Sequence, residues 1–168
     1  MFLTIDDFNQ GKYELGRGSY DTTRLQDYIN KYEQKYLTFM LGADLYAEFK
    51  ADVILGSGYP TEARFQVIFN ALSVDYQWTI LFSQGIVEML KGFIYYEYTK
   101  DQIVAMTNIG NVRPVGENSE VASSLYTQIY TRYNDGVKAY KAIQCYILDN
   151  QAEYDGFNGQ RKLMAYWI

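Results

Sequence analysis

Histidine is absent from the 168-residue chain, and this absence narrows the chemistry available to it. Without imidazole, neither a Ser-His-Asp triad nor a Cys-His pair can be built, and the commonest general base near neutral pH is missing. The single cysteine, Cys145, excludes an internal disulfide and leaves too few ligands for a typical zinc site. We therefore expect no catalytic residue, no metal and no cofactor, and we expect that the protein is not an enzyme.

The chain also lacks a basic surplus and a long apolar run. Its net charge is −5 and its pI is near 4.7, whereas proteins that grip nucleic acid by the phosphates normally show a basic stripe. The most apolar stretch, 78–98, is interrupted by Gln84, Glu88 and Lys91, and is a poor membrane span. The first ten residues have no secretory-signal pattern. These features predict a soluble protein without membrane contact.

Carboxylates are the reactive groups that remain, and three acidic pairs are closely spaced: Asp6 with Asp7, Glu48 with Asp52, and Glu97 with Asp101. A glycosidase or a magnesium site can use such pairs. No calcium-loop or other motif accompanies them, so a solvated helix face, or pairing of Glu97 with Lys100, is the simpler interpretation. A carboxylate-based hydrolase remains the less favoured alternative.

Aromatic residues are abundant, with 18 Tyr, 9 Phe and 2 Trp. Most such rings fill a core, but tyrosine combines a large apolar ring with a hydroxyl that tolerates water, and it is enriched at protein interfaces. The length and the 48% hydrophobic content fit one globular domain with a substantial core.

Apolar residues recur every three or four positions over most of the chain, which predicts a mainly α fold, a bundle of three to five helices. We expect a single domain over 1–168, with an N-terminal arm (about 1–21) and a C-terminal tail (about 151–168). The first predicted helix runs from Thr23, in a capping box with Gln26, to a C-cap at Gly42, and a shorter helix follows it to Val53. Further helices are predicted from a cap at Thr61 to Leu72, from Ser83 or Gly85 toward Val104, and from Ser119 to Asn150. Gly136 is expected to weaken or bend the last helix.

Two segments do not follow the helical pattern. Strict alternation of apolar residues from Val74 to Phe82 predicts a strand, which needs a partner from the arm, the tail or a neighbouring subunit. Residues 107–118 contain Gly110, Pro114 and Gly116 and are expected to form a long loop, a kind of segment that is often functional.

Several segments, in this order, resemble a known family: TRLQDYINKYEQKYLTFMLGADLYAEF, GIVEMLKGFIYYEYTKDQ, the TNIGNV loop and ENSEVASSLYTQIYTRYNDGVKAY. Together they resemble the head–tail connector proteins of tailed bacteriophages. The likeness is greatest to the neck-ring or adaptor proteins of phages that infect Bacteroidetes, including crAss-like phages. It covers about 25–150.

The resemblance implies a structural virion protein, made in the cytoplasm of the bacterial host, that forms a homo-oligomeric ring in the neck, commonly a dodecamer. Such a ring would join the portal protein to the next neck ring or tail protein and would continue the DNA channel without sequence-specific binding. The matching contact residues would be Asn108, Ile109, Asn111, Val112 and Arg113 in the loop, and Phe157, Arg161, Tyr166, Trp167 and Ile168 in the tail. The alternative function is a small protein-binding module of phage or bacterial origin.

Overall fold

The computed structural model describes residues 2–16, 20–102, 105–107, 110–112 and 124–161, and this part of the chain is mainly helical. The α-helices and strands are α1 (Thr22–Leu41), α2 (Ala43–Leu55), α3 (Ala63–Phe69), β1 (Leu72–Tyr76), β2 (Thr79–Ser83), α4 (Ile86–Gln102), β3 (Ala105–Thr107), β4 (Gly110–Val112) and α5 (Ser124–Asp149). Short 3-10 helices lie at Ile5–Phe8, Gly11–Tyr13 and Gln151–Glu153. The predicted mainly α fold with minor β structure is confirmed.

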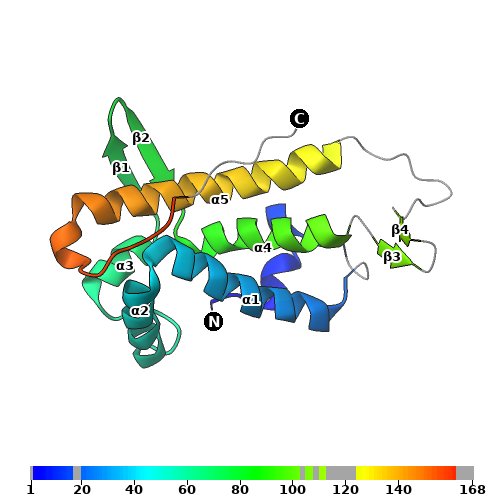
Figure 1. Ribbon diagram of the computed structural model, residues 1–168, viewed down its shortest axis with the longest axis horizontal. Coiled ribbons are helices and arrows are strands. Elements are labelled where there is room, and N and C mark those ends of the chain that lie inside the picture. The colour runs from blue at the N-terminus through cyan, green and yellow to red at the C-terminus, as the bar shows by residue number, and fades with distance from the viewer. Residues whose placement is uncertain (1, 17–19, 103–104, 108–109, 113–123, 162–168) are drawn as a thin grey trace.

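Helix α4 lies between α5 and α1 and packs along both (Figure 1). The middle of its sequence, 93–98, is apolar or aromatic nearly all round, which predicts a helix that is central to the core or shared with another subunit. Phe93, Ile94, Tyr95 and Tyr98 are indeed all buried. The aromatic rings also meet across the helices, because the Tyr36 ring stacks on Phe93 with centroids 4.3 Å apart.

Two glycines set the distance between α4 and α5. A Cβ atom at Gly92 would lie 2.7 Å from the carbonyl oxygen of Arg132, and one at Gly136 would lie 3.0 Å from the Phe93 ring. Helix α5 continues through Gly136 without a break. This glycine therefore permits close packing against α4, whereas the sequence alone suggested that it weakens or bends the helix.

Two helix starts differ from the sequence prediction. The Asp21 carboxylate caps α1 by accepting hydrogen bonds from the amides of Thr23 (2.8 Å) and Arg24 (3.2 Å), so the predicted capping box is wrong. The Thr61 hydroxyl donates to Asp52 instead of capping α3. Gly42, with φ of +85°, separates α1 from α2 as predicted.

The N-terminal segment packs into the body of the protein, in contrast to the extended arm expected from its glycines. Leu3 and Phe8 are fully buried, and Tyr13 nearly so. The Glu33 carboxylate accepts hydrogen bonds from the backbone amides of Phe2 and Leu3 at 3.0–3.3 Å. The N-terminal segment therefore contributes Leu3, Phe8 and Tyr13 to the core.

The first part of the C-terminal tail also belongs to the fold. Tyr154 is buried, and the amides of Asn158 and Gln160 donate to the carbonyls of Leu41 (3.3 Å) and Phe39 (2.7 Å). A Cβ atom at Gly159 would collide with the Met40 carbonyl oxygen, at 1.9 Å. The chain thus returns along the end of α1, where only glycine fits at position 159.

The segment after α4 contains more structure than the loop predicted over 107–118. Strand β3 pairs antiparallel with β4, and Thr107 lies opposite Gly110. The rest of that predicted loop lies outside the described residues.

Candidate interaction surface

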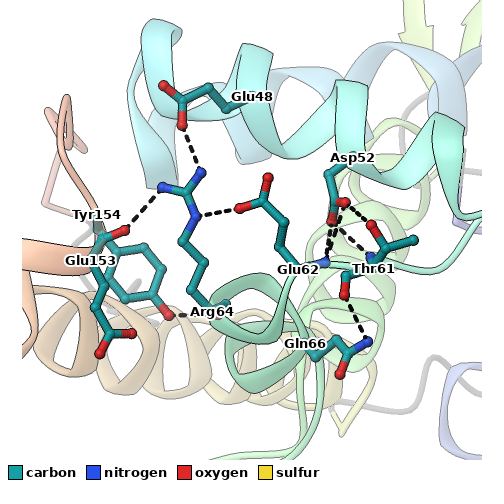
Figure 2. Close-up of polar contacts among 8 residues, drawn as sticks. All are labelled: Glu48, Asp52, Thr61, Glu62, Arg64, Gln66, Glu153 and Tyr154. Carbon is teal, nitrogen blue, oxygen red and sulfur yellow. Dashed lines mark hydrogen bonds and ion pairs between the residues drawn. The ribbon is translucent and has the colours of Figure 1, made fainter.

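The guanidinium of Arg64, on α3, bonds to three other residues (Figure 2). It binds the carboxylates of Glu48 (3.0 Å) and Glu62 (2.7 Å) and the carbonyl oxygen of Glu153 (2.9 Å). The Tyr154 hydroxyl donates to the Arg64 carbonyl oxygen at 2.6 Å. These contacts tie α2, α3 and the 3-10 helix that follows α5 together, which is a structural role.

The two carboxylates of the predicted acidic pair, Glu48 and Asp52, bind different partners. Glu48 pairs with Arg64, whereas Asp52 accepts hydrogen bonds from the amides of Thr61 (2.9 Å) and Glu62 (3.2 Å) and from the Thr61 hydroxyl (Figure 2). Burial raises the pKa of Asp52, but these hydrogen bonds outweigh it and hold the pKa below its usual value. Asp52 is therefore an ionised group that fixes the turn between α2 and α3.

The second pair, Glu97 and Asp101, is also engaged within the fold. The buried Glu97 carboxylate accepts hydrogen bonds from the Tyr36 hydroxyl (2.6 Å) and the Lys100 ammonium (2.8 Å), and Asp101 accepts one from Tyr28 (2.5 Å). Burial raises the pKa of Glu97, but the bonds from Lys100 and Tyr36 outweigh it and leave the pKa below its usual value. The pairing of Glu97 with Lys100 expected from the sequence is confirmed.

The third pair lies in the first 3-10 helix. Asp7 binds the Lys91 ammonium at 2.8 Å, and Asp6 accepts a hydrogen bond from the Asn9 side chain at 2.9 Å. Within the described ranges, no group of three or more Cys, Asp or Glu side chains is placed to hold a metal ion. Cys145 is buried, and its burial raises the pKa of the thiol. The acidic pairs thus stabilise the fold.

The segment predicted as one strand is a β-hairpin that pairs with itself. Leu72 lies opposite Ser83, Val74 opposite Leu81, and Tyr76 opposite Thr79, so a two-residue turn joins β1 to β2. The first turn residue, Gln77, has φ of +54°, a conformation that glycine usually provides. The prediction of β structure here is confirmed, but the single strand and its expected partner from elsewhere are wrong.

Across the two-residue turn, the residues that lie on one face of the hairpin change from even-numbered to odd-numbered positions. Since Val74 pairs with Leu81, even-numbered residues of β1 lie on the same face as odd-numbered residues of β2. Val74 is buried on the side of α5, and the Lys141 ammonium of α5 lies 4.5 Å from the centre of the Tyr76 ring. Ile80 and Phe82 consequently lie on the hairpin face opposite to Val74, and Phe82 borders a pocket that it shares with Tyr13.

Three large apolar side chains are exposed on this hairpin: Trp78 (101%), Phe82 (68%) and Ile80 (52%). Together they form what we term the hairpin patch. The hairpin projects from the helical body beyond α5 (Figure 1). Sequence reasoning grouped these residues with Val74 and Tyr76 on one strand face and missed that they form a separate exposed surface.

A second exposed apolar surface lies at the C-terminal end of α2. Ile54 is 68% exposed and Leu55 is 81% exposed. A pocket of about 200 Å³ adjoins Ile54, and its other apolar lining comes from Phe2, Tyr46, Phe49 and Val53. We term Ile54, Leu55 and this pocket the α2 patch. Ile54 and Leu55 directly follow buried Val53 in one apolar run, so the sequence pattern does not distinguish them from core residues.

The structure describes part of the predicted contact set. Asn111 and Val112 lie in β4, Phe157 is half-buried against the core, and Arg161 is exposed. The remaining predicted contact residues lie outside the described residues: Asn108, Ile109, Arg113, Tyr166, Trp167 and Ile168. Their contact with partners stays a prediction.

In the described part of the chain, no helix combines the length and apolarity needed to cross a membrane. Comparison with protein-family models, curated proteins and solved structures found no match to this chain.

Proposed function

We propose that this chain is a non-catalytic structural subunit that assembles with other protein subunits, and that it forms a ring in the neck of a tailed bacteriophage. In this role it joins the portal protein to the next neck or tail protein and lets DNA pass through the central channel. The single observation that carries the proposal of an assembling subunit is the hairpin patch.

An exposed apolar surface of this kind favours a partner. Trp78, Ile80 and Phe82 expose apolar area to water, and removing such area from water stabilises a complex by about 25 cal/mol per Å². Contiguous exposed apolar patches mark interaction sites, and tryptophan is enriched among the residues that dominate binding energy.

The hairpin is also held in place before any partner arrives. Buried Val74 and the contact of Lys141 with the Tyr76 ring attach it to α5. A surface whose geometry is already fixed loses less conformational entropy on binding. This favours an assembly element over a segment whose exposure is incidental.

The more specific assignment to a phage neck rests on the resemblance of the segments within 25–150 to connector proteins. The net charge of −5 agrees with it, because an acidic channel would repel the DNA backbone and let it slide. The alternative, a module that binds another protein, would use the same hairpin patch. The two proposals differ in the location that they predict for the chain, since only the neck subunit must be a component of the virion.

Quantitative mass spectrometry of purified virions tests the proposal. We expect the chain in multiple copies per particle, and we expect a Trp78→Ser/Phe82→Ser variant to be strongly depleted. The matched control is Leu148→Ser, which removes an exposed apolar side chain of α5 outside the patch. Absence of the wild-type chain from virions, with capture of a host protein instead, would support the binding-module alternative. Equal incorporation of both variants would contradict the role of the hairpin.

A further inference from the structure

The two apolar patches lie at opposite edges of the molecule. The hairpin projects at the top of Figure 1, beyond α5, and the C-terminal end of α2 projects at the bottom. One copy therefore cannot cover its own α2 patch with its own hairpin. Any contact between the two patches joins different copies through different surfaces, which is a heterologous contact.

The charges beside the two patches are complementary. Asp75 is the only charged residue of the hairpin, and its strand partner is Ile80, so it stands on the outward face. Lys50 lines the pocket of the α2 patch, one helical turn before Ile54. Both side chains are exposed, and neither has an ion-pair partner among the residues that the structure describes.

The pocket also fits the chemistry of the hairpin tip. Phe2, Tyr46 and Phe49 supply aromatic walls, and offset or edge-on aromatic pairs add attraction beyond their buried area. Glu33 also lines the pocket, and its carboxylate accepts hydrogen bonds from the amides of Phe2 and Leu3. Lys50 is the cation in the pocket lining.

We propose that the hairpin patch of one copy docks on the α2 patch of the next copy, with Trp78 in the pocket and Asp75 paired with Lys50. This inference rests on the proposed function, since it names the contact that joins neighbouring subunits. Repetition of a heterologous contact closes a ring or continues as a filament, according to the rotation between copies.

A single contact of this kind is modest. Trp78 and Phe82 each bury roughly 150–250 Å² when fully covered, whereas a stable interface covers about 800 Å² per partner. We expect self-association that is weak for one pair of copies and strengthened when a ring closes, because the last contact is then intramolecular.

Charge reversal tests the pairing. Asp75→Lys alone and Lys50→Asp alone each place like charges at every contact, and we expect each to weaken self-association about tenfold. The double variant Asp75→Lys/Lys50→Asp restores opposite charges and is expected to regain the wild-type dissociation constant within about threefold. An equimolar mixture of the two single variants should also assemble, because every contact in an alternating assembly again joins opposite charges.

The measurement is sedimentation velocity over a concentration series at low and high salt. The matched control is Asp27→Lys, which makes the same charge change at an exposed position of α1 and should leave self-association unchanged. Circular dichroism and melting curves check that each variant is folded. A wild-type chain that stays monomeric at every concentration, or single variants that associate like wild type, would overturn the proposed contact.

Failure of this inference is separate from failure of the proposed function. Virions that contain the chain as a ring, combined with charge reversals that have no effect, would overturn the contact and leave the function standing. Self-association that is rescued by the double variant, in a chain missing from virions, would support the contact and overturn the function.

Discussion

Gly92 of α4 faces Gly136 of α5, and a Cβ atom on Gly92 would lie 3.6 Å from the Gly136 Cα. No side chain separates the two helices at this point. The pair thus allows the central helix of the protein to approach its longest neighbour at backbone contact distance.

Replacing Gly92 by alanine should destabilise the protein, although alanine favours helix formation by about 1 kcal/mol. The new methyl group would meet the Arg132 carbonyl oxygen at 2.7 Å, and relief of such a clash costs about 1–3 kcal/mol. We expect a smaller loss for Gly136→Ala, because the nearest atom is on the Phe93 ring. Urea unfolding measures both, and a Gly92→Ala variant more stable than wild type would disprove the close approach.

Acidification should destabilise the fold through Glu97. Its pKa in the folded protein is lower than the usual 4.5, so its contribution is present above about pH 4.5 and is lost as the pH falls through the folded pKa. Glu97→Gln removes this titration, and its stability should therefore fall less steeply than that of wild type below pH 5. Unfolding free energies from pH 7 to pH 3 measure the two slopes. Parallel curves would show that Glu97 is not paired as described.

Lys100→Met supplies a second variant for the same cluster. Loss of the ammonium 2.8 Å from Glu97 should raise the pKa of that carboxyl and lower stability at pH 7. The Tyr36 hydroxyl remains as a donor, so the variant should still fold. A variant with the wild-type pH profile would assign no role to Lys100.

The hairpin turn offers a stabilising substitution. Gln77 has φ of +54°, which costs a residue with a Cβ about 1–2 kcal/mol in the left-handed region. Gln77→Gly should stabilise the hairpin by about 0.5–1 kcal/mol, whereas the β-branched control Gln77→Val should destabilise it. Hydrogen exchange of the amides in β1 and β2 reports the change. Faster exchange in the glycine variant would contradict the observed turn.

Arg64 provides a test of the polar network between α2, α3 and the 3-10 helix at Gln151–Glu153. Arg64→Lys keeps the charge but cannot bind Glu48, Glu62 and the Glu153 carbonyl together. We expect a loss of about 1 kcal/mol in unfolding free energy, and a much smaller loss for Glu48→Gln, which removes one exposed contact. Equal effects of the two variants would show that the three contacts are not cooperative.

The helical part of this fold was predictable because its core faces follow helical spacing. Leu45, Phe49 and Val53 of α2 and Phe65 and Ile68 of α3 are buried as that spacing requires. The boundaries were less predictable, since Asp21, Thr23 and Thr61 all have side chains that can cap a helix. Tertiary contacts decided among them, as the hydrogen bond of Thr61 to Asp52 illustrates.

The hairpin shows why the candidate surface was not predictable. Apolar residues alternate with polar ones from Val74 to Ile80, and the turn residues Gln77 and Trp78 are neither glycine nor asparagine, which normally signal a hairpin. The alternation therefore predicts one continuous strand face. Only the register reveals that Ile80 and Phe82 lie on the face opposite to Val74.

Electron cryomicroscopy of the necks of purified virions tests the central claim most directly. We predict a closed ring of this chain next to the portal, with the exposed hairpin of each subunit at a boundary between subunits. Virion necks in which no ring fits this fold would contradict the assignment of the chain as a neck subunit.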